Sequence, residues 1–373
     1  MRYCLISVIL LIILACGGGN EDSSADVADG QTGSISQVDS VTAEWLEYIQ
    51  SSDDGLWEGN AEHLVSCFYS GNLTDPEALD PIVYKPYALC TSGDTVFVTD
   101  AATQEIVALN SAGELLWRAG GEGEAPGHFP RISTLTASRR YVAASNYYLG
   151  RIEFFNRDGS FSHSLTFAGA EDIAAIDDTT FAVASTGEPG GSIHIINCEE
   201  GIVRSFGEAE MIHFKDVPRM DLMLLCLSND NRLAVFNRYE GLLAIYDLTT
   251  EESLYRGSRE YPALPQEPVS FTNSNGQTQR MFFTVGANPF LGPEGMLNIV
   301  FPGYMEDGSF FSDPENTDFA PVTAIDRYDW DGNYLDSYCL PDSSLSSTAL
   351  LPGNRLVVKN YSEGNLRLYD LRD

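Results

Sequence analysis

The stretch YVAASNYYLGRIEFFNRDGSF, residues 141–161, contains the pattern that decides the fold. An apolar run over Tyr141–Ser145 is followed by a second run over Arg151–Phe155, which ends in Asn156 and a turn containing Gly159. Short runs rich in aromatic and aliphatic residues, joined by turns with Asn, Asp or Gly, are typical of antiparallel strands. The stretch therefore predicts a β-hairpin.

This hairpin pattern occurs six times along the chain. Its Asn or Asp positions are separated by 46, 41, 50, 82 and 41 residues, and they are Asn110, Asn156, Asn197, Asp247, Asp329 and Asp370. A strand-like run precedes each hairpin: Thr95–Thr99, Tyr141–Ser145, Thr180–Ser185, Arg232–Phe236, Met296–Phe301 and Arg355–Lys359. A further apolar run precedes each of those: Tyr87–Cys90, Ile132–Thr136, Asp172–Ile176, Leu222–Leu227, Met281–Val285 and Ser347–Leu351. Repeats of ~40 residues with four strands each are typical of β-propellers.

The sequence thus predicts an all-β, six-bladed β-propeller. The 82-residue interval leaves room for a seventh unit, but it contains a single good inner-strand pair, and its extra length lies in residues 260–278 and 304–320. The last unit ends at Asp373 without a fourth strand, whereas a spare strand pattern over His63–Ser70 precedes the first unit. We expect the spare strand to complete the last blade, because this closes the ring and removes an exposed edge.

Residues 120–159 resemble one NHL repeat. The resemblance rests on GGEGEAPGHFP at 120–130, YVAASN at 141–146, RIEFF at 151–155 and the Asp158–Gly159 turn. Ser145 stands where the family has Asp, and the other units keep fragments such as VFVTD at 96–100. The resemblance implies the exported six-bladed NHL-like (TolB-like) propellers of bacterial envelopes, and it implies no particular activity.

The first residues have the features of an export signal. Arg2 precedes an apolar run to Leu14, which is too short to cross a bilayer of roughly 30 Å as a helix. Residues 13–16, Ile-Leu-Ala-Cys, resemble the lipobox of bacterial prolipoproteins, which implies cleavage before Cys16 and its lipidation. We expect a signal peptide over 1–15, a flexible Gly/Ser/acid-rich tether over 16–60 and the propeller over 61–373. Gly17 resembles lipoproteins sent to an outer membrane.

Composition narrows the choice of partners. The chain has 21 Lys and Arg against 54 Asp and Glu, a net charge of −33, which opposes binding to nucleic acid. The expected partners are the membrane, through the anchor, and a protein, peptide or glycan, with the chain itself a monomer. Five cysteines besides Cys4 and Cys16 are scattered and show no metal-site spacing: Cys67, Cys90, Cys198, Cys226 and Cys339.

Candidate ligand-binding residues follow the second strands of the units, where a propeller presents its loops. They are Asn146, Tyr147, Tyr148, Glu188, Arg238, Tyr239, Glu240, Asn360, Tyr361, Ser362 and Glu363. These residues fit a sugar, a peptide or a small anion, and they equally fit an ordinary polar loop surface. Asp329–Asn333 resembles a fragment of a calcium loop, but its spacing is wrong for an EF-type site and its position is that of a hairpin turn. No cofactor is therefore expected, and calcium has no further support.

Two functions of different classes remain open from the sequence. The first is a non-catalytic binding or interaction scaffold, favoured because no nucleophile, HExxH or Walker-type motif occurs. The alternative is a metal-dependent hydrolase or lyase with a site in the central channel, as the six-bladed lactonases and amidating lyases have. The five histidines are far apart in sequence, so they give that alternative no direct support.

Overall fold

The computed structural model describes residues 64–66, 68–75, 81–185, 189–207, 223–238, 242–258, 269–272, 278–281, 287–304, 322–340, 345–360 and 364–371. The chain divides into two compact units, residues 1–53 with 262–283 and residues 54–261 with 284–373. The described part of the first unit is an antiparallel hairpin of β19 (Val269–Thr272) and β20 (Thr278–Met281).

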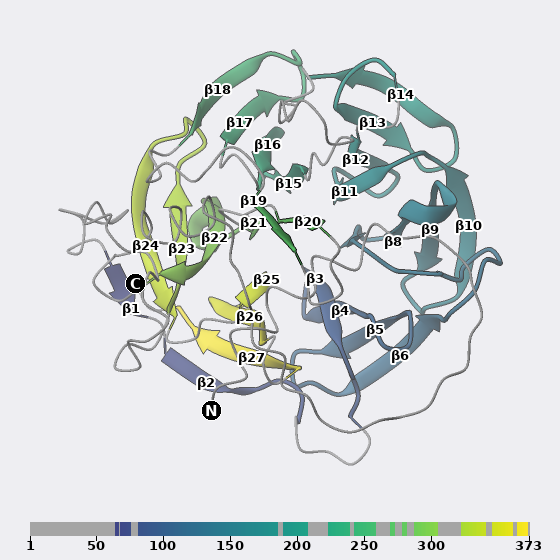
Figure 1. Cartoon of the computed structure of the whole chain (residues 1–373), viewed down its shortest axis with the longest axis horizontal. Helices are drawn as coiled ribbons and strands as arrows, with labels where there is room; N and C mark the ends of the chain where they lie inside the picture. The colour runs from purple at the N-terminus through teal and green to yellow at the C-terminus, as the bar shows by residue number, and fades with distance from the viewer. Residues whose placement is uncertain are drawn as a thin grey trace. The chain divides into compact units, whose positions relative to one another are not determined.

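The second unit is a ring of six antiparallel sheets, the predicted six-bladed propeller (Figure 1). Blades 1 to 3 are β3 to β6 (Pro86–Ser92, Thr95–Asp100, Glu105–Asn110, Leu115–Gly120), β7 to β10 (Leu135–Ala137, Tyr141–Asn146, Arg151–Asn156, Phe161–Thr166) and β11 to β14 (Ala170–Ala175, Thr180–Ser185, Ile193–Asn197, Gly201–Phe206). Blades 4 to 6 are β15 to β18 (Met223–Leu227, Arg232–Asn237, Leu242–Asp247, Ser253–Ser258), β21 to β24 (Ala287–Leu291, Leu297–Tyr304, Val322–Tyr328, Tyr334–Leu340) and β25 to β27 (Leu345–Leu351, Arg355–Asn360, Asn365–Asp370) with β2 (Phe68–Asn72). The first strands contact one another in cyclic order, from β3 through β25 and back to β3.

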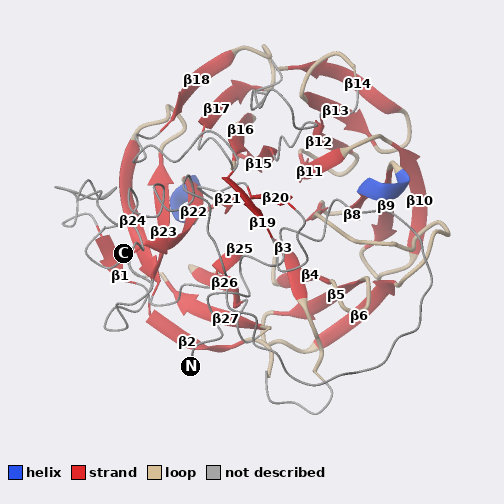
Figure 2. Ribbon diagram, viewed as in Figure 1, coloured by secondary structure: helices blue, strands red, loops and turns tan. Residues whose placement is uncertain are grey.

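Helical structure is minimal in the described residues, as the two short 3-10 turns η3 (Tyr147–Leu149) and η4 (Pro293–Gly295) show (Figure 2). Within that part of the chain, no helix has the length and apolar character needed to cross a membrane.

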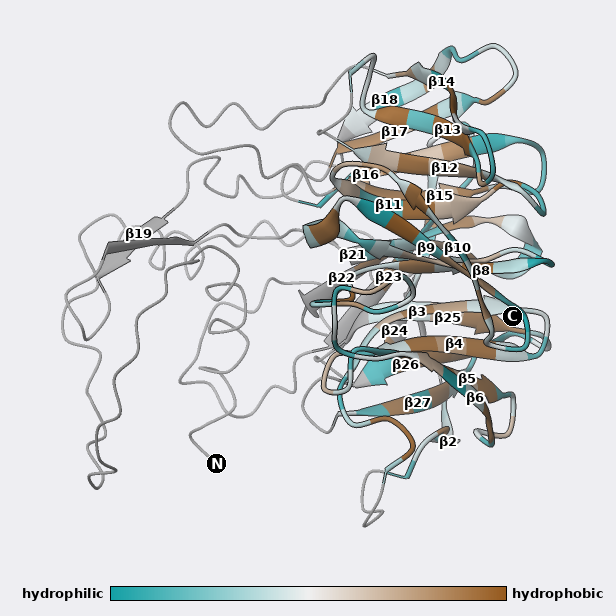
Figure 3. Ribbon diagram, turned by 90° about the vertical axis from the view of Figure 1, so that its right-hand side faces the viewer, coloured by the Kyte–Doolittle hydropathy of each residue, from teal (hydrophilic) through white to brown (hydrophobic). Residues whose placement is uncertain are grey.

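The core lies between neighbouring blades. In one cluster, Phe97 and Ile106 of blade 1 pack against Val142 and Phe155 of blade 2. Because second and third strands have a blade on each side, both of their faces are buried, and they read as continuous apolar runs rather than alternating ones. Figure 3 shows apolar stretches along such strands, for example β4 and β12, in a view from the side.

The N-terminal strand closes the ring as predicted, with shifted bounds. Strand β2 (Phe68–Asn72) pairs antiparallel with β27 and becomes the outer strand of blade 6. The sequence placed this strand at 63–70. In the structure β1 (Leu64–Ser66) instead pairs parallel with β24, the outer strand of blade 5. The segment before blade 1 therefore covers the outer edges of two blades.

The predicted inner strand of the fifth unit is wrong. Met281 belongs to β20, residues 282–285 lie outside the described part, and the inner strand is β21 (Ala287–Leu291). The sequence did not predict this strand because it contains Pro289, and proline is rare within strands. The strand tolerates Pro289 because an inner strand has a ladder partner on one side, and the register shifts between Ala287 and Pro289.

The repeated Asn or Asp shapes the hairpin turns. Asn110 Oδ1 accepts the Ala112 and Glu114 N–H groups, both at 2.9 Å, and Asp247 Oδ1 accepts the Thr249 N–H at 2.6 Å. A side chain that accepts backbone donors two residues later stabilises a turn directly. Asn197 and Asp329 accept backbone N–H groups in the same way, so the recurring residue has this local role in four of the six units.

Candidate functional site

The chain direction gives the ring two different faces. The first strand of each blade joins the second, and the third joins the fourth, through tight turns on one side, such as those at Gly93 and Gly113. We call this side the turn face. The second strand ends on the opposite side, the loop face, where blades also connect to one another through segments such as residues 121–134.

The six first strands line a central channel with a cavity of about 250 Å³. Each first strand has a ladder partner on one side, so the backbone groups on its other edge face the channel. Such groups require hydrogen-bond partners when they are buried. The channel is where the enzyme alternative places its site, so the state of its polar groups bears directly on function.

Side-chain hydroxyl groups form hydrogen bonds with these backbone groups across neighbouring blades. Ser347 Oγ of blade 6 accepts the Leu89 N–H of blade 1 at 3.1 Å, and Thr91 Oγ1 of blade 1 donates to Leu350 O at 2.7 Å. Between blades 2 and 3, Thr136 Oγ1 accepts the Ala175 N–H at 3.3 Å. These channel hydroxyls therefore hold adjacent blades together.

Asp172 is the buried carboxyl of this channel and links three blades. Its Oδ1 accepts Thr134 Oγ1 of blade 2 at 2.5 Å, and its Oδ2 accepts the Leu225 N–H of blade 4 at 2.9 Å. Burial raises the pKa of Asp172 to about 6, and the hydrogen bonds from Thr134, Leu225 and Ile173 oppose this without cancelling it. The carboxyl is thus fully bonded to protein groups.

The channel thiols are not activated. Burial raises the pKa of Cys90 to about 12, and it also raises the pKa of Cys226 above its usual value. A thiol acts as a nucleophile or metal ligand through its thiolate, which these positions disfavour. No three His, Cys, Asp or Glu side chains gather as a metal site within the described residues.

Other buried ionisable groups also have structural partners. Three third-strand residues face a serine 11 positions later in the fourth strand. His194 Nδ1 lies 2.8 Å from Ser205 Oγ, Ser337 Oγ donates to Asp326 Oδ1 at 2.6 Å, and Ser164 Oγ donates to Glu153. The equal spacing in three blades marks a repeated packing element.

The calcium-like fragment forms a hairpin turn. Asp329 Oδ1 accepts the Asp331 N–H at 3.0 Å and the Asn333 N–H at 2.8 Å. Burial raises the pKa of the Asp329 carboxyl, but the hydrogen bonds from Asn333 and Asp331 outweigh it and hold the pKa below its ordinary value. The carboxylate is therefore satisfied by its own turn.

Of the three predicted ligand residues of blade 2, one is buried and two are exposed. Asn146 is fully buried and donates from Nδ2 to His128 O at 2.9 Å, so it holds the 121–134 connection. Tyr147 and Tyr148 are 48% and 55% exposed on η3, with their rings edge-to-face. Arg131 donates to Tyr148 Oη at 3.1 Å, which fixes this ring on the loop face.

The remaining predicted residues are partly described. Arg238 is half-buried directly after β16, and Asn360 ends β26. Both strand ends lie on the loop face. Glu188, Tyr239, Glu240, Tyr361, Ser362 and Glu363 lie outside the described residues, as do Cys16, His63 and His213.

Sequence reasoning missed a buried lysine near the end of a second strand. Lys359 in β26 is 4% exposed, and its Nζ lies 3.5 Å from Tyr87 O and 5.2 Å from the centre of the Tyr87 ring. Burial, followed by the positive charges of Lys85 and Arg238, lowers the pKa of Lys359 to about 8. A lysine inside the apolar run RLVVKN at 355–360 was the available signal.

Asp100 fixes the segment that leads into β3 and contains Tyr84 and Lys85. It is fully buried at the end of β4, where Oδ2 accepts the Tyr84 N–H at 2.7 Å and Oδ1 accepts the Lys85 N–H at 3.0 Å. Tyr84 is 47% exposed and Tyr87 is 38% exposed. The bonds to Asp100 hold the backbone that carries these two rings and Lys85.

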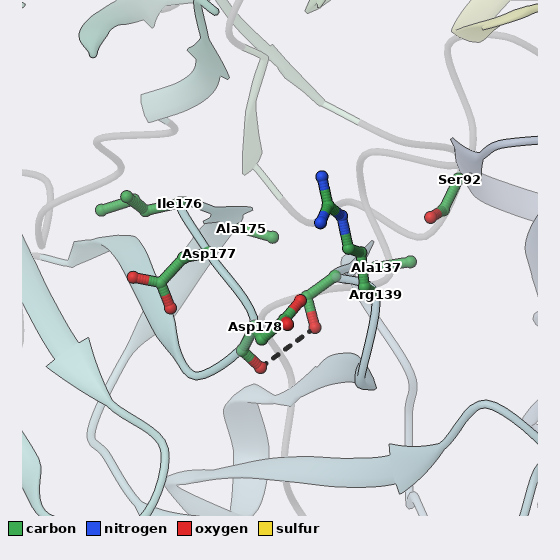
Figure 4. A pocket seen from close by; sticks show the side chains of 8 residues that line it. Ser92, Ala137, Arg139, Ala175, Ile176, Asp177 and Asp178 are labelled. Carbon is green, nitrogen blue, oxygen red and sulfur yellow. Dashed lines mark hydrogen bonds between the residues drawn. The ribbon is translucent and has the colours of Figure 1, made fainter.

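The turn face has a hollow of about 570 Å³ between the turns of blades 1, 2 and 3 (Figure 4). Its polar groups serve the turns themselves. Asp177 Oδ1 accepts the Thr179 and Thr180 N–H groups at 2.8 Å each, and Ser138 Oγ donates to Asp178 O at 3.2 Å. The Asp177 and Ser138 side chains in this hollow therefore stabilise the turns rather than point together toward a ligand.

Solved structures with a similar backbone include three proteins from bacteria. BamB from Moraxella catarrhalis has a TM-score of 0.41 at 14% identity, over 76% of this chain and 82% of that one. The calcium-binding protein regucalcin from Agrobacterium tumefaciens has 0.47 at 13%, over 82% and 94%. Virginiamycin B lyase from Staphylococcus aureus has 0.44 at 13%, over 78% and 85%. No residue role is transferred from similarities this low.

Comparison of the sequence with known proteins identifies no family for this chain. No family model matches the chain. No curated protein sequence matches it either.

The two faces differ in what they offer to a ligand. Four of the five exposed tyrosines in the described residues lie on the loop face: Tyr84, Tyr87, Tyr147 and Tyr148. Arg131, Lys85, Arg238 and the buried Lys359 belong to the same face, together with the exposed Glu122 and Glu124. The turn face carries acidic turn residues such as Asp178, Glu199 and Asp331 together with the exposed Arg139 and Arg140, and none of the exposed tyrosines of the described residues lies in these turns.

Proposed function

We propose that the chain is a lipid-anchored lipoprotein of the bacterial cell envelope whose NHL-like propeller binds a protein, peptide or glycan through its loop face. The observation that carries this proposal is the gathering of exposed tyrosines on that face, with Arg131 bonded to Tyr148. Tyr and Arg are enriched at recognition surfaces, because they combine a large contact area with hydrogen bonding. Functional loops on a rigid scaffold are also the usual arrangement.

The channel chemistry favours a scaffold over the hydrolase or lyase alternative. Asp172, Ser347 and the channel threonines bond neighbouring blades, and the pKa values of Cys90 and Cys226 are raised. A channel enzyme needs a nucleophile, base or metal set that is free to meet a substrate. The described channel groups are instead used to hold the ring.

The anchor part of the proposal rests on residues 1–16. Cys16 carries the lipid, residues 16–60 form the tether and the monomeric propeller follows, facing the periplasm or the surface from a membrane that we propose to be the outer one. The net charge of −33 disfavours nucleic acid as the partner. Several acyl chains on one cysteine would give stable anchoring, which a single chain does not.

Cys16→Ser tests the anchor. We expect the variant to lose incorporation of labelled palmitate and to leave the membrane fraction, because the acylated sulfur is absent. Fractionation and labelling of cells expressing the full chain measure both effects, with Cys4→Ser as the matched control. Continued labelling of the Cys16→Ser variant would show that another residue carries the lipid.

Photo-crosslinking tests the binding face. A crosslinker at Tyr148 should give a discrete adduct in intact envelopes, and one at Asp178 on the turn face should not. Both side chains are exposed, so accessibility alone does not distinguish them.

A further inference from the structure

The seven cysteines of the chain divide into three groups by position. Cys4 lies in the signal peptide that we propose, and Cys16 is the proposed lipid site. Three others are free thiols within the described residues: Cys90, Cys198 and Cys226. The remaining two, Cys67 and Cys339, are far apart in sequence, and the closure of the ring brings their chain segments together.

The strand pairing places the backbone of Cys339 beside the segment that contains Cys67. Strand β1 pairs parallel with β24, and the last ladder pair joins Ser66 to Cys339. Cys67 is the next residue in the chain; it lies outside the described residues, but both of its neighbours lie within them. On its other side Phe68 begins β2 and pairs with Asp370 of blade 6. Cys67 therefore connects two ladders whose registers are defined.

This spacing suits a disulfide. Cα atoms of ladder partners are about 4.8 Å apart, and consecutive Cα atoms are about 3.8 Å apart. Two such steps at right angles span roughly 6 Å, which is within the Cα separation of about 4.4–6.8 Å that disulfides require. Because β1 ends at Ser66 and Phe68 joins the ladder of another blade, Cys67 is not bound to the alternation that directs successive side chains of one strand to opposite faces.

Strand β1 is weakly held by its backbone pairing alone. It has three ladder pairs with β24, and parallel pairing is slightly less stable per residue than antiparallel pairing. The end segments of a domain are poorly ordered unless they are tied down. Strand β24 is fixed on its other side, because Cys339 also pairs with Ala324 of β23. A covalent bond at this point therefore ties a weakly held strand to a firmly held one.

We propose that Cys67 and Cys339 form a disulfide that fastens the N-terminal segment to blade 5. The sulfur–sulfur bond forms as each thiol loses a proton and the pair loses two electrons, which reduce the disulfide of an exchange partner to two thiols. Compartments outside the cytosol supply such partners. The disulfide therefore rests on the proposed function for its oxidant, but not for the pairing of the two residues.

Peptide mapping of the full chain tests the pairing. Cells are lysed in denaturant with an alkylating agent that blocks every free thiol, and the chain is digested without reductant. We expect one linked peptide pair that carries Cys67 and Cys339 and is lighter than the two thiol peptides by two hydrogen atoms. The peptides with Cys90, Cys198 and Cys226 should be alkylated. Cys198→Ser, which removes a free thiol, is the matched control and should keep the linked pair.

Thermal unfolding separates a covalent link from ordinary packing. Cys67→Ser, Cys339→Ser and the double variant should all lose the same several degrees in Tm, because either substitution alone removes the whole bond. A reducing agent should lower the Tm of the wild-type chain by a similar amount and leave the three variants unchanged. Losses that add up in the double variant would contradict a shared bond.

Alkylation of both Cys67 and Cys339 in cells, with no linked pair after the folded chain is treated with oxidised glutathione, would overturn the disulfide. A link from either cysteine to a different partner would overturn it too. Both results leave the proposed function standing if Cys16 still takes up labelled palmitate. A linked pair that forms with oxidised glutathione but is absent from cells would instead support the pairing and contradict the proposed location.

Discussion

Asp172→Asn is expected to stabilise the chain at pH 7 by up to about 3 kcal/mol. Burial raises the pKa of this carboxyl from 3.8 to about 6, so ionised Asp172 costs free energy in the folded state at neutral pH. Asparagine avoids that cost and keeps both contacts. Its amide oxygen accepts the Leu225 N–H, and its amide nitrogen donates to Thr134 Oγ1.

The pH dependence of the stabilisation by Asp172→Asn tests whether ionisation of Asp172 is its cause. Because the folded pKa is raised, the wild-type chain binds a proton more readily when folded, and this contribution to stability is lost as pH rises from about 4 through 6. The difference in unfolding free energy between Asp172→Asn and wild type should therefore grow across that window and then level off. Urea denaturation at several pH values measures it. A difference that is constant with pH would contradict the assignment.

Asp172→Ala is the comparison variant. It removes the charge as asparagine does, but it leaves the Leu225 N–H without its acceptor and opens space in the channel. We expect it to be less stable than Asp172→Asn by about 2 kcal/mol.

Gly113→Ala is expected to destabilise the ring by about 3 kcal/mol or more. Gly113 has φ of +83°, and a Cβ there would lie 1.9 Å from Leu73 O, a backbone atom. Leu73 follows the closing strand β2, and its N–H donates to Leu366 O of blade 6 at 2.7 Å. The added methyl group therefore pushes the chain away from the contact that links blade 6 to blade 1.

Gly353→Ala provides a closely matched control. Its φ of +79° imposes a similar backbone strain, but a Cβ there meets nothing within 4 Å. We expect it to lose about 1 kcal/mol. Thermal unfolding of both variants measures the difference. Equal losses would show that the segment at Leu73 does not pass over the blade 1 turn, and the account of ring closure would fail.

The repeat predicted most of the ring because its cause is local. Asn110, Asn197, Asp247 and Asp329 accept backbone N–H groups of their own turns, so their positions mark four of the six blades directly. The fifth inner strand was missed because Pro289 is tolerated there by an edge that exists only in the assembled ring. The pairing of β1 with β24 was missed for a related reason, since a parallel pairing between distant segments leaves no local pattern.

The candidate site was less predictable than the fold. Position after a second strand identified Tyr147 and Tyr148 as loop-face residues, and they are exposed as a ligand contact requires. The same rule selected Asn146, whose side chain is buried and holds a connection. Lys359 was not predicted because the residue that it contacts, Tyr87, comes from another blade.

Position-resolved photo-crosslinking is the most direct test of the claim that the loop face is the binding face. The crosslinker is placed in the full chain at Tyr84 or Tyr148 on the loop face, and at Asp178 or Asp331 on the turn face, all of them exposed. We predict one discrete adduct shared by the two loop-face positions and absent from the two turn-face positions. An adduct formed from Asp178 or Asp331 and not from Tyr84 or Tyr148 would contradict the account.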